Sequence, residues 1–153
     1  MSESSRGKVV TLDELVAQLD VIRTEAARLR DLLNQLMTER DLIVRAKEGI
    51  DAMIRSNPDS PVLFPLSTGL VALVEAKPES RNKVIVHLGA EVYAKVDASE
   101  GLKLLTEEEG EINKAINEVA KRLSEVESLQ SQYESVIQQA LAAAQARQGA
   151  QGK

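Results

Sequence analysis

Residues 61–97 read PVLFPLSTGLVALVEAKPESRNKVIVHLGAEVYAKVD, and this stretch decides the fold because the chain on either side of it has helical periodicity. Four short apolar runs, at 62–64, 69–74, 84–88 and 92–96, alternate with clusters of Pro, Gly, Ser and Asn. Short runs rich in β-branched residues and bounded by turn formers are typical of strands joined by hairpins. We therefore predict a small β region, the β head, between two helical segments.

A coiled-coil repeat precedes the β head. Thr11 and Glu14 have the spacing of a capping box, in which each residue's side chain accepts a bond from the other's backbone N–H. From there, apolar residues recur at alternating spacings of three and four, which is typical of a coiled-coil seam. The row comprises Leu12, Leu15, Leu19, Ile22, Ala26, Leu29, Leu33, Leu36, Arg40, Ile43, Lys47, Ile50 and Ile54, with Arg40 and Lys47 as its polar members. Pro58 disfavours helical backbone before it, so we predict a helix over 11–56.

A second repeat of the same length follows the β head, and its polar members are Glu109 and Gln130. The row comprises Leu102, Leu105, Glu109, Ile112, Ile116, Val119, Leu123, Val126, Gln130, Tyr133, Ile137, Ala140 and Ala144. Both 97–100 and 106–109 fit a capping box, and Gly101 and Gly110 each weaken a helix by about 1 kcal/mol. We expect a helix over 98–146 that has either a weak start or a separate first turn.

Two seams of equal length on either side of a β insert fit two antiparallel partners. The predicted fold class is mainly α with a small β region, namely a long antiparallel coiled-coil hairpin whose helices are joined by the β head. We expect a single domain over 1–153, with the β head at 61–97 and frayed tails at 1–8 and 147–153.

Composition excludes several classes of function. The net charge is −5, which gives no basic surface for nucleic acid or anionic membranes. The chain has no cysteine, so it has neither disulfides nor thiolate metal sites. Its apolar runs fall short of the roughly 18 residues of a membrane span, and its first residues lack a signal-peptide core. We expect a soluble, cytoplasmic protein.

The sequence indicates no catalytic, cofactor or metal site, so we do not expect an enzyme. His87 is the single histidine and has no second ligand at metal-binding spacing. The acidic run 107–109 with Glu111 fits favourable charge at a helix N-terminus better than a cation site. The glycines do not have the spacing of a phosphate-binding loop.

The β head carries apolar side chains on both faces of its short strands. A small isolated β hairpin is marginally stable in water, and open strand edges favour pairing with other chains. We therefore predict an obligate oligomer held together through the β head. The expected contact residues are Leu70, Val71, Leu73, Val74, Val84, Ile85, Val86, Leu88 and Val92.

The order of these segments resembles the alpha-class subunits of prefoldin. The resemblance is carried by two long heptad helices on either side of PLSTGLVALVEA and NKVIVHLGAEVYAKVDASEGLKLL, and is most specific over 84–93. It implies two hairpins in the β head and a hexamer of two alpha and four beta subunits, with β barrels as its body and coiled coils as its arms. It also implies binding of unfolded polypeptides without nucleotide and their delivery to a cytosolic chaperonin.

The two chain termini are predicted to lie together at one end of the helical hairpin. The apolar residues there exceed what one seam needs, and exposed aliphatic patches mark interaction sites. Two interpretations remain: these residues close the coiled coil on itself, or they bind clients. The candidate client-binding residues are Val9, Val10, Leu12, Leu15, Val16, Leu19, Val136, Ile137 and Leu141.

Two classes of function are consistent with the sequence. The first is a subunit of an ATP-independent holdase, which captures unfolded polypeptides at the tips of its coiled coils. The second is a coiled-coil scaffold or tether that binds specific folded partners. A third, an enzyme with a nucleic-acid-binding arm, is disfavoured by the negative charge. A holdase suppresses the aggregation of unrelated unfolded proteins, whereas a tether does not.

Overall fold

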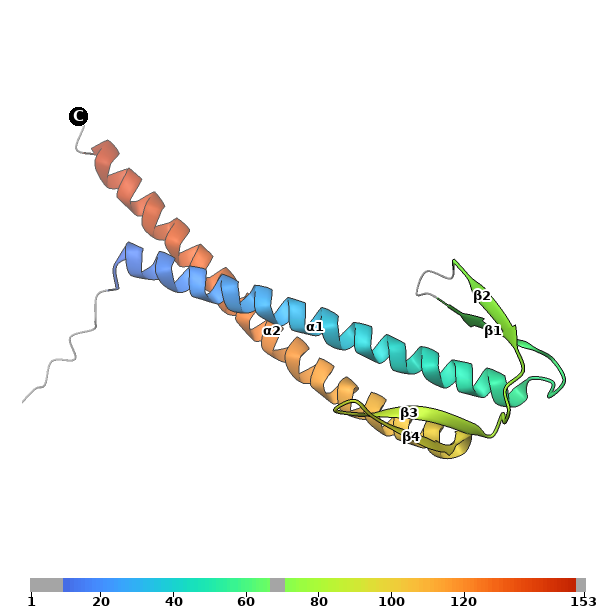
Figure 1. The fold of residues 1–153 in the computed structure, drawn as a ribbon. Coiled ribbons are helices and arrows are strands. Elements are labelled where there is room, and N and C mark those ends of the chain that lie inside the picture. Colours follow the sequence, from blue (N-terminus) through green and yellow to red (C-terminus); the bar gives the residue numbers. More distant parts are fainter. Residues whose placement is uncertain (1–9, 67–70, 151–153) are drawn as a thin grey trace, which may run out of the picture. The chain divides into compact units, whose positions relative to one another are not determined.

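The computed structural model describes residues 10–66 and 71–150, and these form two long helices with two small β hairpins between them (Figure 1). The elements in chain order are α1 (Leu12–Arg55), β1 (Val62–Pro65), β2 (Leu73–Ala76), β3 (Lys83–Gly89), β4 (Val92–Asp97) and α2 (Ala98–Ala150). This is the predicted fold class. The described residues divide into two compact units: a terminal unit of 10–36 with 115–150, and a hairpin unit of 37–114.

In the terminal unit, α1 and α2 pair in opposite directions. Arg23 contacts Glu134 and Arg30 contacts Glu127, so rising numbers on α1 meet falling numbers on α2. The core of this unit consists of Ile22, Ala26, Leu29, Val119, Leu123 and Val126. All six belong to the predicted seams, which confirms that the heptad spacing identified the packed face of each helix.

In the hairpin unit, seam residues of both helices are also buried. Ile43 of α1 and Leu105 and Ile112 of α2 are buried there. The polar seam residues Lys47 and Glu109 form an ion pair across the two helices, with Nζ and Oε2 separated by 2.7 Å.

The N-terminus of α1 has the predicted capping box. The backbone N–H of Thr11 donates to Glu14 Oε2 at 3.0 Å, and the N–H of Glu14 donates to Thr11 Oγ1 at 3.2 Å. At the other end, the Ser56 hydroxyl donates to the Met53 carbonyl, directly before the turn that contains Pro58. Two of the free N–H groups at the helix start and one carbonyl at its end are thereby satisfied.

The second helix is continuous and begins directly after β4, without a connecting loop. It runs through both Gly101 and Gly110 and ends at Ala150, four residues beyond the predicted 146. Thr106 does not start a helix: its hydroxyl donates to the Leu102 carbonyl inside α2. The helix begins at Ala98, whose N–H donates to the Asn82 carbonyl at 2.7 Å.

The β head contains two separate antiparallel sheets, β1 with β2 and β3 with β4. The second strand occupies Leu73–Ala76 and not the predicted 69–74. Its position is set by pairing with β1, from Val62 opposite Ala76 to Pro65 opposite Leu73, and the N–H of Leu66 donates to the Ala72 carbonyl beside this ladder. The predicted contact residue Leu70 lies outside the described residues.

The turn between β3 and β4 has left-handed backbone at three successive residues. Gly89, Ala90 and Glu91 have φ angles of 95°, 47° and 59°. A two-residue hairpin loop of this kind matches the twist of the strands but favours glycine or asparagine. Ala90 and Glu91 are therefore held there against a local preference of about 1–2 kcal/mol per residue.

Gly101 lets the β3–β4 hairpin lie directly against the first turns of α2, as seen in Figure 1. A Cβ atom at this position would lie 2.6 Å from Val84 Cγ2 and 3.3 Å from Val86 Cγ2. Val96 of β4 approaches the same point. Gly101 is thus explained by close packing of the hairpin on the helix, and not by a weak helix start as the sequence suggested.

We expect Gly101→Ala to lower the melting temperature of the chain although alanine favours helix. The new methyl group must displace Val84, and overpacking of a fitted contact costs about 1–3 kcal/mol, against about 1 kcal/mol gained in helix propensity. Gly110→Ala is the matched control, because a Cβ there meets nothing within 4 Å. Thermal unfolding followed by circular dichroism should show Gly110→Ala stabilised and Gly101→Ala destabilised; equal stabilisation of both variants would contradict the packing explanation.

Candidate functional site

The β1–β2 hairpin presents apolar side chains on both of its faces. Phe64 is paired with Val74 on one face, and Pro65 with Leu73 on the other. All of these side chains are exposed, as is Leu63. Apolar groups exposed on both faces of a two-stranded sheet favour burial by another chain.

The β3–β4 hairpin has one covered face and one open face. Val86 is 6% exposed and packs with half-buried Val84 against Gly101, whereas Ile85 on the opposite face is 69% exposed. Tyr93 shares the open face and contacts His87, with 4.9 Å between ring centroids. The single histidine is therefore an exposed strand residue in contact with an aromatic ring.

The predicted contact residues of the β head therefore fall into two groups. Val84 and Val86 are largely occupied by packing within their own chain. Surface that is open to a partner is contributed by Val71, Leu73, Val74, Ile85, Leu88 and Val92.

An apolar groove of about 770 Å³ lies in the hairpin unit, between α1 and the β strands. Leu42, Ala46 and Met53 line it from α1, while Val62 and Phe64 line it from β1. These helix residues were not predicted as a binding surface. The signal for them was a second apolar row beside the seam, at spacings of four and seven residues.

Arg81 holds the linker between the two hairpins against the end of α1. Its guanidinium donates to the Ser56 hydroxyl and to the carbonyls of Pro58 and Ser60. One residue later, the Asn82 carbonyl accepts from the first N–H of α2. Two adjacent linker residues thus bind the end of one helix and the start of the other, which positions both hairpins within this unit.

In the terminal unit, several predicted client-binding residues are accessible and others are not. Val10, Leu12, Val16, Val136 and Leu141 are exposed, and Leu15 is half-buried. Leu19 and Ile137 are only 6% and 9% exposed, so they contribute to the seam and not to accessible surface. Val9 lies outside the described residues.

A second apolar surface of the terminal unit was not predicted. Val21 is 70% exposed and, with Ala17, Ile22 and Leu129, lines a shallow hollow of about 380 Å³. Tyr133 completes the hollow, and its hydroxyl donates to Gln18 Oε1 at 2.8 Å. Val21 was not predicted because it lies one position before the seam residue Ile22 and is not part of the heptad row.

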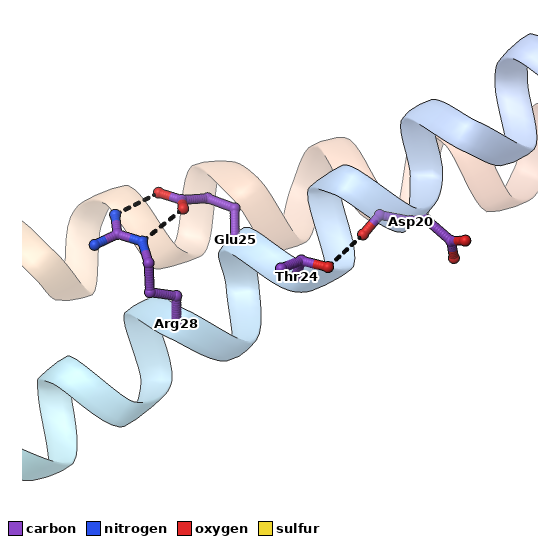
Figure 2. A network of polar contacts seen from close by, with 4 residues as sticks. All are labelled: Asp20, Thr24, Glu25 and Arg28. Atoms are coloured by element: carbon purple, nitrogen blue, oxygen red, sulfur yellow. Dashed lines mark hydrogen bonds and ion pairs between the residues drawn. The ribbon is translucent and has the colours of Figure 1, made fainter.

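Next to this surface, the polar face of α1 is stabilised by contacts within the helix (Figure 2). The Arg28 guanidinium donates two bonds of 2.8 Å to the Glu25 carboxylate, and the Thr24 hydroxyl donates to the Asp20 carbonyl. The bond from Arg28 holds the pKa of Glu25 below its ordinary value. These groups form a charged, solvated helix face and are not arranged around a ligand.

The acidic run 107–109 and Glu111 lie inside α2 and not at a helix N-terminus as predicted, because α2 begins at Ala98. Glu109 contacts Lys47, and Glu111 contacts Lys114. Among the residues described, no group of three or more His, Asp or Glu side chains is placed to hold a metal ion. Over the same residues, neither helix is long and apolar enough to cross a membrane.

Glu134 connects the two helices of the terminal unit. Its Oε1 accepts a bond of 3.0 Å from the Gln130 amide and one of 2.9 Å from Arg23. These bonds, first that from Gln130 and then that from Arg23, hold the pKa of Glu134 below its ordinary value. The unfolded chain therefore binds this proton more tightly than the folded chain. The contribution to stability is full above the ordinary pKa and is lost as the pH falls through the lowered one.

We expect Gln130→Ala to raise the pKa of Glu134 toward its ordinary value, because the bond with the largest effect on that pKa is removed. An NMR titration of the Glu134 carboxyl carbon measures this shift. Gln139→Ala, an exposed change on the same helix, should leave the pKa as it is. An unchanged pKa in Gln130→Ala would show that the amide does not hold the carboxylate.

The chain is similar to known proteins over most of its length. The profile of the prefoldin family, described as Prefoldin subunit, matches residues 12–146. The prefoldin alpha subunit of Aeropyrum pernix is 32% identical over 138 residues, covering 90% of this chain and 89% of the relative. That of Saccharolobus solfataricus is 32% identical over 148 residues, covering 97% and 98%. A filamentous prefoldin structure from Methanocaldococcus jannaschii has a TM-score of 0.49 at 21% identity and covers 84% of this chain and 96% of the other.

Two long paired helices joined by two β hairpins with exposed apolar faces define the subunit of an assembly. The chain belongs to the prefoldin family, which comprises components of a chaperone, and the relatives named above are alpha subunits. The sequence resemblance to alpha-class prefoldin subunits predicted this family, and the prediction is confirmed.

Proposed function

We propose that the protein is the alpha-type subunit of an ATP-independent holdase. The holdase captures unfolded polypeptides on the terminal unit and delivers them to a cytosolic chaperonin. The observation that carries this proposal is the accessible aliphatic surface of the terminal unit, where Val10, Val16, Val136 and Leu141 stay exposed beside a closed seam. The hollow around Val21 and Leu129 extends that surface beyond the predicted residues.

The physical properties of this surface suit an unfolded client. Burial of one aliphatic side chain contributes about 1.5–3 kcal/mol, and ordering of the client opposes part of that gain. A single arm therefore binds weakly. Several arms on one assembly raise the apparent affinity through effective concentration, without any new type of contact. Client capture of this kind depends on apolar contact and needs no nucleotide.

The partners in this proposal are beta-type prefoldin subunits, in the ratio of two alpha to four beta that the family resemblance implies. The open faces of the β head supply the contact: Leu63 and Phe64 of β1, Val74 of β2, and Ile85 of β3. The groove beside α1 adds further apolar surface to the same unit. The proposed location is the cytoplasm, where such a chaperonin acts.

We expect Ile85→Glu to reduce assembly with a beta-type subunit while leaving the helix content unchanged. A charge on the open face of β3 opposes burial by another chain, but it does not touch the packing on Gly101. Val21→Glu is the matched control, because Val21 is as exposed, at 70% against 69%, and lies in the terminal unit. Light scattering of each variant mixed with a beta-type subunit reports the mass; a full-size assembly with Ile85→Glu would remove this face from the interface.

For client binding, we expect Val136→Gln with Leu141→Gln to impair protection of a denatured protein from aggregation by several-fold. The assembly should keep its size, since neither side chain is part of the buried seam. The control pair, Ala27→Gln with Ala120→Gln, adds two amides at exposed positions of the same unit without removing a large aliphatic group. Turbidity of several unrelated denatured proteins, with and without ATP, is the measurement.

Full protection by the Val136 and Leu141 variant would exclude these side chains from client binding. If the original assembly protects none of the clients but binds one folded partner, the tether function applies instead. Faster transfer of a bound client to a purified chaperonin, measured against release into solution, tests the delivery step separately.

A further inference from the structure

Two polar residues interrupt the aliphatic seams of the hairpin unit, and they meet each other. Lys47 of α1 and Glu109 of α2 are both seam residues, and their Nζ and Oε2 atoms lie 2.7 Å apart. Their side chains are only 26% and 23% exposed. Among the ion pairs described in the chain, this one is the least exposed.

The other ion pairs between the helices differ in placement. Arg23–Glu134 and Arg30–Glu127 lie beside the seam and keep at least about a third of each side chain in contact with solvent. Exposed pairs of this kind contribute little to stability and tolerate mismatch, because water solvates a charge that loses its partner. A lysine or glutamate within the seam lacks that compensation when its partner is absent.

A shift in the register of the two helices separates Lys47 from Glu109. A shift of one heptad in one direction brings Lys47 opposite Ile116 and Glu109 opposite Ile54, which leaves both charges against aliphatic side chains. A shift in the other direction brings Lys47 opposite Leu102 and replaces Lys47 by Arg40 as the residue opposite Glu109. Apart from Arg40 and Gln130, the remaining seam residues do not distinguish these registers by themselves, since one apolar layer packs against another in each.

We propose that Lys47 and Glu109 are the specificity-determining pair of this helical hairpin. They oppose the slip that leaves both of their charges against aliphatic side chains, and they favour the chain's own second helix over the helix of any subunit that lacks an acidic residue opposite Lys47. Replacement of such a pair by apolar residues is often neutral or stabilising, so specificity and not stability is the property it provides. This inference concerns how the hairpin is selected and does not depend on client binding.

The test is a distance measurement on the full-length chain, which has no cysteine of its own. Spin labels at Glu39→Cys and Lys103→Cys, both exposed and within the hairpin unit, should give a single narrow distance peak in the original chain. A slip of one heptad moves the helices past each other by about 10 Å, since each residue rises 1.5 Å. We expect Lys47→Leu with Glu109→Leu to remain folded and to add a second peak displaced on that scale.

The control replaces an interhelical pair outside the seam, with Arg30→Leu and Glu127→Leu, and should retain the single peak. The charge-swapped chain, with Lys47→Glu and Glu109→Lys, should also retain it, whereas Lys47→Glu alone should lose it. A single unshifted peak in the leucine pair would overturn the proposal. If the leucine pair does not fold, the swap decides: restoration of the single peak supports the proposal, and its failure overturns it.

Discussion

The structure depends on the closing of one narrow aliphatic seam along each helix. A chain with almost no aromatic residues has little else to bury, and an amphipathic helix of this kind is not stable by itself in water. Each helix therefore needs a partner with the same repeat, and the antiparallel return of α2 supplies it. Small, well-fitted residues such as Ala26, which is fully buried, let the helices approach closely at the core of the terminal unit.

The β head differs from the helices because only part of its apolar surface is buried within its own chain. One of its hairpins finds cover on the helix start, where Gly101 makes room for Val84 and Val86. The other faces, including Ile85 and Phe64, have no comparable cover among the described residues. Apolar side chains that stay exposed on the β head are suited to burial by another subunit. This agrees with the chain's membership of the prefoldin family.

The helices, their packed faces and the Thr11–Glu14 cap were predictable because local spacing determines them. The second strand was misplaced because its position is set by pairing with β1, which the apolar run at 69–74 does not reveal by itself. The prediction that Gly101 marks a weak helix start was wrong. The glycine is needed for a contact with β3, and a contact between segments cannot be predicted from local sequence. The candidate client-binding residues were predicted one by one, but Ile137 is buried whereas its neighbour Val136 is exposed, because which side chains remain open depends on how the two helices face each other in the terminal unit.

The pairing of segments far apart in the chain has a consequence for synthesis on the ribosome. Leu19 is completed long before Ile137, the residue with which it shares a seam in the terminal unit, and at about 5–20 residues per second the interval is on the order of 6–24 s. During that time the first heptad row has no partner from its own chain. A component of a chaperone thus passes through a stage in which its own nascent chain presents the kind of surface that chaperones bind.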